Sequence, residues 1–125
     1  MKRLFLLLSV ILFFGNELYS QSKIDCSNVK TQAEITICTL NEYNAADKEL
    51  NILYKKVFAK LTDKQRVVLI SAQRKWIDYR DEHCKLYALL YKDGSIATSV
   101  IFANKTETTR TRIKELQDLL AQLDL

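Results

Sequence analysis

Residues 61–65 read Leu-Thr-Asp-Lys-Gln and separate two long stretches with helical periodicity. Thr62 and Gln65 have the spacing of a capping box, in which a hydroxyl and a later side chain satisfy free backbone amides at the start of a helix. We therefore expect one helix to end near Leu61 and the next to begin directly after Thr62. A connection this short forces the two helices to run antiparallel.

Large side chains recur three or four residues apart on both sides of this turn, which is the period of a helix. In residues 31–61 they form one face of a first helix: Tyr43, Asp47, Leu50, Tyr54, Val57 and Leu61. In the second helix the predicted core seam consists of Leu69, Ala72, Trp76, Tyr79, His83, Leu86 or Tyr87, and Leu90. Lys92-Asp93-Gly94 should end this helix, with Gly94 in the left-handed position, and Ser95 can cap the next.

A third helix is predicted over residues 98–123, where apolar residues still recur with helical spacing. Four threonines in its middle are poor helix formers: Thr106, Thr108, Thr109 and Thr111. The sequence contains no proline and only two glycines, which are too few for a β-rich domain with frequent turns. The predicted fold class is therefore all-α, a long antiparallel helical hairpin with a third helix packed against it.

The first twenty residues have the pattern of a secretory signal peptide. Lys2 and Arg3 precede an apolar run over residues 4–14, which a more polar stretch follows. The apolar run is shorter than the roughly twenty residues of a transmembrane helix. We expect cleavage of residues 1–20 and export of residues 21–125 as a single helical domain, periplasmic or secreted, with no stable membrane insertion afterwards.

The charge pattern argues against nucleic acid as a partner. Loss of residues 1–20 would change 19 basic and 15 acidic residues to 17 and 14, so the formal net charge would fall from +4 to +3. Lysine and arginine alternate with aspartate and glutamate along the chain instead of gathering in a basic stripe. Such alternation is typical of solvated helix faces.

Three cysteines in an exported protein predict one disulfide and one unpaired thiol. Cys38 lies off the seam of the first helix, on a side that an N-terminal arm can cover, and the chain from Cys26 to the helix start is long enough to reach it. This reasoning favours the pair Cys26 and Cys38 and leaves Cys84 unpaired, on the side where the third helix docks. The rival pairing is Cys38 with Cys84, because counting back from the turn places these residues nearly opposite each other.

Little in the sequence supports catalysis or cofactor binding. His83 is the only histidine and falls on the predicted seam, where a core role is more frequent than a role as a base. The cysteines lack C-x-x-C spacing, and there is no glycine-rich loop, so neither a zinc site nor a phosphate site is predicted. We expect a protein that is not an enzyme and that needs no metal or cofactor.

The densest group of distinctive residues lies on the second helix: Gln73, Trp76, Tyr79, Arg80, Asp81 and Cys84. Trp76 and Arg80 are one helical turn apart, so the guanidinium can lie on the indole ring or reach a carboxylate such as Asp47 on the first helix. A buried arginine that is paired across a hairpin fixes the register of the two helices. We interpret this group as structural rather than as a partner-binding surface.

With residues elsewhere in the chain, this group resembles the lysozyme inhibitor LprI-like N-terminal domain family. The resemblance is carried by Gln-x-x-Trp-x-x-Tyr-Arg-Asp-x-x-Cys at residues 73–84 and by the two upstream cysteines. Further matching residues include Asp25, Glu34, Ile37, Asp47, Leu50, Asn51, Tyr54, Gly94, Ser95, Thr109, Arg112, Glu115 and Leu116. The resemblance implies an exported, cysteine-bridged helical domain, and the family takes its name from a member described as an inhibitor.

The chain departs from the family pattern in one respect. The family usually has a fourth cysteine early in the last helix, and the corresponding place here is near Asn104. This absence agrees with an unpaired Cys84, and it implies a third helix without a covalent tie. We therefore expect weaker docking of that helix.

Two functions are compatible with the sequence, and in both the protein acts by binding another protein. The leading hypothesis is inhibition of a lysozyme by blocking its cleft, with contacts from exposed acids such as Glu42, Glu49 or Glu107. The alternative is an envelope module for protein–protein interaction without inhibitory activity. That alternative predicts exposed apolar side chains, for which the candidates are Tyr87, Leu89, Tyr91, Ile101 and Phe102.

Overall fold

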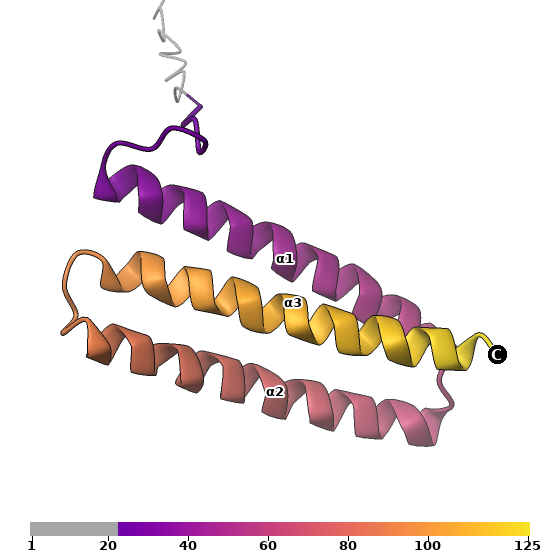
Figure 1. Cartoon of the computed structure of the whole chain (residues 1–125). Coiled ribbons are helices and arrows are strands. Elements are labelled where there is room, and N and C mark those ends of the chain that lie inside the picture. The colour runs from indigo at the N-terminus through magenta and orange to yellow at the C-terminus, as the bar shows by residue number, and fades with distance from the viewer. Residues whose placement is uncertain (1–22) are drawn as a thin grey trace, which may run out of the picture.

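The computed structural model describes residues 23–125, so the predicted signal sequence lies outside the described residues. Three long helices form most of this part of the chain: α1 (Gln32–Lys60), α2 (Asp63–Leu90) and α3 (Ala97–Leu123). Figure 1 shows that α1 and α2 run antiparallel and that α3 returns in the direction of α1. The all-α prediction is confirmed. No helix within residues 23–125 is both long enough and apolar enough to cross a membrane.

Side-chain caps fix the starts of the first two helices. Thr31 accepts a hydrogen bond from the amide of Glu34, and the Glu34 carboxylate accepts one from the Thr31 amide. Thr62 and Gln65 make the same reciprocal pair of bonds at the start of α2. The predicted capping box at Thr62 is thereby confirmed, and it leaves only Leu61 and Thr62 between α1 and α2.

The turn between α2 and α3 differs from the prediction. Helix α2 ends at Leu90 with Tyr91 as its C-cap, so the left-handed residues are Lys92 and Asp93, with φ of 52° and 51°, and not Gly94. A Cβ at position 94 would lie 3.2 Å from the carbonyl oxygen of Tyr91, a tight contact that favours glycine there. The predicted cap at Ser95 is also wrong, since α3 begins after Ile96 without a side-chain cap.

Helix α3 packs closely against both other helices, whereas α1 and α2 approach each other less closely. The buried residues in the first half of α3 are small, which allows close approach of two backbones: Ala97, Ser99, Thr106 and Thr109. At the two ends of the α1–α3 pair, Gln32 Nε2 donates to Ser99 Oγ at 3.0 Å and Lys60 forms an ion pair with Asp124. The third helix is therefore the element that both others contact, rather than an addition to a closed hairpin.

The threonines of α3 are accommodated because their hydroxyls have acceptors within the same helix. Thr106, Thr108 and Thr111 each donate to the carbonyl oxygen four residues earlier, at 2.9, 2.9 and 3.1 Å. Thr109 is fully buried, and its hydroxyl has no hydrogen-bond partner in the described chain. Two of these weak helix formers, Thr106 and Thr109, are buried where small side chains are needed, whereas Thr108 is half-buried and Thr111 is exposed.

The apolar core fills the other half of the bundle, near the α1–α2 turn. It consists of Leu50, Leu53, Val57, Leu61, Leu69, Ile113 and Leu116. Tyr54, Phe58 and Trp76 pack against this cluster as partly buried residues. Because the cluster takes residues from all three helices, burial of its side chains stabilises the bundle as a unit.

The packing face of α2 follows the predicted seam only in its first half. Leu69 is buried and Trp76 packs against the core, but Tyr79, Leu86 and Leu90, which their spacing predicts in the core, are 56, 56 and 74% exposed. Tyr87, the alternative to Leu86, is half-buried. Beyond Trp76 the buried residues of α2 are Arg80, Cys84 and Ala88. Spacing alone could not find this face, because its central residue is a charged arginine whose burial depends on partners from elsewhere.

The unpaired hydroxyl of Thr109 leads to a prediction. Thr109→Val should raise the free energy of unfolding by about 1 kcal/mol, because it replaces an unsatisfied buried hydroxyl with a methyl group of the same shape. Thr106→Val is the matched control, since the Thr106 hydroxyl is bonded to Phe102, and it should give no gain. Urea unfolding followed by circular dichroism measures both, and equal effects would contradict the prediction.

Candidate functional site

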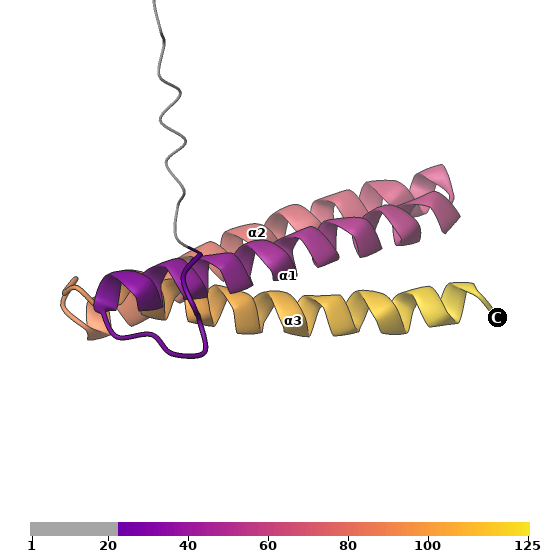
Figure 2. The same ribbon diagram turned by 90° about the horizontal axis from the view of Figure 1, so that it is seen from above.

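An N-terminal arm, residues 23–31, crosses α1 before the helix begins (Figure 2). A disulfide joins Cys26 in this arm to Cys38 in α1, with the Cα atoms 5.7 Å apart. This is the favoured of the two pairings, and Cys84 remains as a buried free thiol. The disulfide therefore attaches the arm to the outer side of the first helix.

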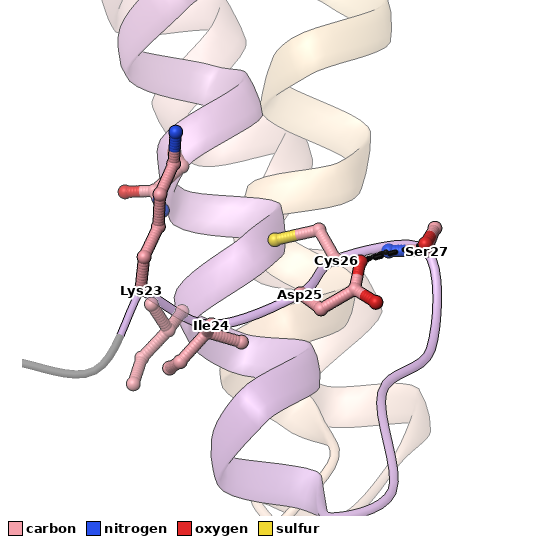
Figure 3. A pocket seen from close by; sticks show the side chains of 7 residues that line it. Lys23, Ile24, Asp25, Cys26 and Ser27 are labelled. Atoms are coloured by element: carbon pink, nitrogen blue, oxygen red, sulfur yellow. Dashed lines mark hydrogen bonds between the residues drawn. The ribbon is translucent and has the colours of Figure 1, made fainter.

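The arm and α1 enclose an open hollow, which Figure 3 shows from close by. Its lining consists of Lys23, Ile24, Asp25, Cys26, Ser27, Ile37 and Asn41. The Asp25 carboxylate accepts hydrogen bonds from the hydroxyl and amide of Ser27, at 2.6 and 3.0 Å, and these bonds lower the pKa of Asp25. Because Asp25 is an ionised turn residue, it is not suited to act as a general acid.

The motif predicted on the second helix forms a charged cluster between the helices. Arg80 is 6% exposed, and its Nε donates to Asp81 at 2.9 Å while one terminal nitrogen lies 3.5 Å from Asp47 of α1. The guanidinium carbon lies 5.1 Å from the ring centre of Trp76 and 5.5 Å from that of Tyr43. Arg80 thus has both of the contacts that its spacing suggested, the indole and the Asp47 carboxylate.

Lys105 of α3 extends this cluster to the third helix. Its Nζ lies 3.1 Å from Asp81 and 5.6 Å from the ring centre of Tyr43. Partial burial opposes ionisation of Asp81, but hydrogen bonds from Arg80 and Lys105 outweigh it and hold the pKa of Asp81 below its ordinary value. Burial opposes ionisation of Arg80, but the hydrogen bond to Asp81 together with the nearby Tyr43, Asp81 and Asp47 raises its pKa. All three helices therefore meet through one network of opposite charges.

The other motif residues have separate contacts. Gln73 accepts a hydrogen bond from Arg112 of α3 at 3.1 Å, and Tyr54 stacks on Phe58 at the edge of the core with ring centres 6.2 Å apart. Tyr79 is 56% exposed and takes no part in the Arg80 cluster. Most of the motif thus lies between helices, while Tyr79 faces outward.

Cys84 is fully buried one turn after Arg80, beside Thr108 of α3. Burial raises the pKa of its thiol, which keeps the sulfur protonated and a poor nucleophile at neutral pH. It lies on the side where α3 docks, as its position on the helix indicated. Cys84 is therefore a small packing residue between α2 and α3.

His83 lies between two tyrosines on α2 and is half-buried. It stacks on Tyr79 with ring centres 5.3 Å apart and meets the edge of Tyr87 at 5.6 Å. These contacts are with aromatic rings and not with a carboxylate that could orient an imidazole for proton transfer. Within residues 23–125, no three histidine, cysteine, aspartate or glutamate side chains lie close enough to hold a metal ion.

Sequence reasoning missed two members of the charged cluster, Tyr43 as a partner of Arg80 and Lys105 as a partner of Asp81. Tyr43 was assigned only to a helix face, and Lys105 is one of many lysines that alternate with acidic residues. No local pattern distinguishes Lys105 from these, because its role follows from how α3 packs. Tyr43 and Lys105 can be recognised as members of the cluster only from the packing of the three helices.

The fold and this cluster define a small three-helix protein with a disulfide-tethered arm and a structural charged centre. A family model described as lysozyme inhibitor LprI matches residues 24–116, and the chain belongs to this family. The chain is also similar to an uncharacterized protein of Rhizobium meliloti (strain 1021), with 34% identity over 113 residues that cover 80% of this chain and 81% of that protein. No solved structure matches the chain significantly.

Replacement of the buried Arg80 guanidinium should destabilise the fold even when a positive charge is kept at this position. Arg80→Lys should lower the free energy of unfolding by about 2–3 kcal/mol, because an ammonium cannot bond Asp81 while it lies on Trp76 and reaches Asp47. Arg110→Lys, in an exposed pair with Glu107, should change it by less than about 0.5 kcal/mol. Thermal and urea unfolding compare the two variants, and equal losses would show that the cluster does not hold the helices together.

The lowered pKa of Asp81 predicts acid sensitivity. Ionised Asp81 stabilises the fold above its unfolded pKa, near 3.8, and this stabilisation is lost as pH falls through the lower folded value. Asp81→Asn should therefore be less stable at neutral pH and should lose less stability between about pH 5 and pH 2. Unfolding curves measured across this range give the slope of the unfolding free energy against pH for the two proteins. Asp118→Asn, in an exposed pair with Lys114, controls for the loss of a surface charge.

Proposed function

We propose that the protein is exported and inhibits a lysozyme by blocking its substrate cleft. The observation that carries this proposal is the match to the lysozyme inhibitor family over residues 24–116, which include α1, α2 and α3 as far as Leu116. The basic and apolar N-terminal pattern supports export, to the periplasm or out of the cell. A disulfide in the mature part agrees with an oxidising compartment.

The charged cluster at Arg80 is not the proposed contact surface. Arg80 and Cys84 are buried, and their partners are other residues of the same chain. A residue that is buried in this way can support a binding surface only through the helices that it holds. The lysozyme contacts must therefore come from exposed residues outside the motif.

Two exposed acids on α1 are the best candidates. Glu42 and Glu49 are seven residues apart, so they lie on one face of the helix, about 140–160° around it from Asp47, which faces α2. Neither takes part in an ion pair within residues 23–125, whereas Glu107 is already paired with Arg110 at 2.7 Å. Free carboxylates are the better partners for a cationic enzyme surface.

Long-range attraction contributes little to this interaction. Residues 21–125 have a formal charge of 17 − 14 = +3, so the exported protein gains no favourable steering toward a basic lysozyme. Affinity has to come from local contacts, in which unpaired carboxylates meet basic side chains at the rim of the cleft. Such contacts are sensitive to salt when they are exposed.

The decisive measurement is inhibition of several lysozyme types by the protein purified after secretion. We expect submicromolar inhibition of at least one type, weakened by added salt. The double variant Glu42→Gln/Glu49→Gln should weaken inhibition by roughly tenfold, because each carboxylate contributes under 1 kcal/mol at an exposed contact. Glu107→Gln is the matched control, and it should have a smaller effect because Arg110 already neutralises this carboxylate.

Absence of inhibition by folded protein across all types would contradict the proposal and favour the envelope interaction module. The exposed apolar residues at the end of α2 support that second function, with Leu89 at 64% and Tyr91 at 47% exposure. The other candidates, Tyr87, Ile101 and Phe102, are half-buried, and Phe102 stacks on Tyr43 with ring centres 5.8 Å apart. A partner of the module would therefore contact Leu89 and Tyr91 rather than α3.

A further inference from the structure

Helix α2 carries a second apolar stripe that faces away from the core, here called the outer stripe: Val68, Ala72, Tyr79, Leu86 and Leu90. At 100° per residue, these five positions fall within a sector about 40° wide. All five are exposed, Val68 at 66% and Leu90 at 74% among them. Exposed apolar side chains that recur on one face along a whole helix are typical of an interaction surface.

The spacing of the outer-stripe residues is the same in both directions along α2. Its residues are separated by four, seven, seven and four positions, so the pattern is symmetric about Tyr79. If a two-fold axis passes through Tyr79, an antiparallel second copy of α2 places its Leu90 opposite Val68 and its Leu86 opposite Ala72. A two-fold interface needs this kind of self-complementary surface.

The charges beside the outer stripe follow the same symmetry. Lys75 and Glu82 lie on the same flank of the stripe, and they are almost equally distant from Tyr79. In the antiparallel arrangement, Lys75 of each copy meets Glu82 of the other, which gives two ion pairs. Lys75 takes part in no ion pair within residues 23–125, and Glu82 pairs only with the exposed Lys85.

The end of the stripe at Val68 and Ala72 borders an apolar groove, and the end at Leu86 and Leu90 has side chains that can fill the same groove of a second copy. The groove, of about 460 Å³, lies between the start of α2 and the end of α3, and its apolar lining is Leu61, Val68, Leu69, Ala72, Leu119 and Leu123. Leu86 and Leu90 are exposed at the far end of α2. The two-fold axis brings these leucines of each copy to the groove of the other.

We propose that the outer stripe is the interface of an antiparallel homodimer, in which Leu86 and Leu90 of each copy occupy the apolar groove of the other. The occupant is a second copy of this chain, because three features are arranged symmetrically about Tyr79. These are the spacing of the stripe residues, the positions of Lys75 and Glu82, and the apolar groove at one end of α2 with Leu86 and Leu90 at the other. The proposal does not depend on lysozyme inhibition. It also leaves Glu42 and Glu49 of α1 free.

The first test measures molecular mass by sedimentation equilibrium, with protein purified after secretion at about 1 µM to 1 mM, a range that covers ordinary dimer affinities. We expect a monomer–dimer equilibrium that Val68→Glu shifts to monomer. Val67→Glu is the matched control, since Val67 is 68% exposed and lies 100° around the helix from Val68. It should leave the equilibrium unchanged.

Charge reversal provides a second test that does not touch the apolar groove. Lys75→Glu alone and Glu82→Lys alone each place two like charges together in the dimer, and each should raise the dissociation constant by roughly tenfold or more. The double variant Lys75→Glu/Glu82→Lys restores opposite charges across the axis and should recover dimerisation. Recovery is specific to this arrangement, because Lys75 and Glu82 do not contact each other within one chain.

Three outcomes would overturn the proposal. The first is a monomer throughout the concentration range. The second is a dimer that Val68→Glu and Val67→Glu affect equally, or that the double charge variant fails to restore. The third is a monomer whose lysozyme inhibition is lost in Val68→Glu and kept in Val67→Glu, which would assign the outer stripe to a partner protein instead. Circular dichroism of each variant confirms that the helices are retained.

Discussion

The burial of Arg80 is the constraint on which the arrangement of the helices depends. A guanidinium with a side-chain exposure of 7% needs carboxylates close by, and the fold brings Asp47 from α1 and Asp81 from α2 to it. Lys105 of α3 balances the second carboxylate, so every helix contributes at least one charge. A slip of any helix by one turn would separate these partners and leave a buried charge without compensation. The cluster therefore specifies the relative position of the helices, while the apolar core supplies most of the stabilisation.

Side-chain size explains why the three helix contacts differ. Between α1 and α3 the buried residues are small, as at Ala46 and Thr106, and the backbones approach closely. Between α1 and α2 the space holds the guanidinium of Arg80 with the aromatic rings around it, so these helices are held further apart. Thr106 and Thr109 weaken α3 as an isolated helix, but as small buried residues they let it dock closely. Local propensity and tertiary packing are in conflict here, and packing decides the structure.

Much of the fold could be predicted from the sequence because its strongest signals are local. Thr62 and Gln65 lie three residues apart, so a capping box needs no knowledge of the rest of the chain. The spacing of apolar residues could not give the packing face of α2, because burial of a charged residue such as Arg80 depends on partners from other helices; only the motif indicated the Arg80–Asp47 pair. The same reason hid Lys105 from the candidate site. The left-handed position was predicted at Gly94, but α2 already ends at Leu90, so Lys92 and Asp93 adopt this conformation instead.

Four residues of the outer stripe, Ala72, Tyr79, Leu86 and Leu90, belong to the seam that their spacing predicts in the core, and they form an apolar face on the outside of α2. A helix that packs inward through Arg80 and Cys84 does not need Tyr79 and Leu86 for its own stability, since they lie about 100–160° away around its axis. Exposed apolar side chains favour aggregation, so a chain that keeps them in a symmetric pattern has a use for them other than folding. The two proposals assign different faces to different tasks. The free acids of α1 would contact a lysozyme, and the outer stripe of α2 would join two copies, so a dimer would present two inhibitory faces at once. Two linked binding faces would raise the apparent affinity for lysozyme at a cell-wall surface without any new contact.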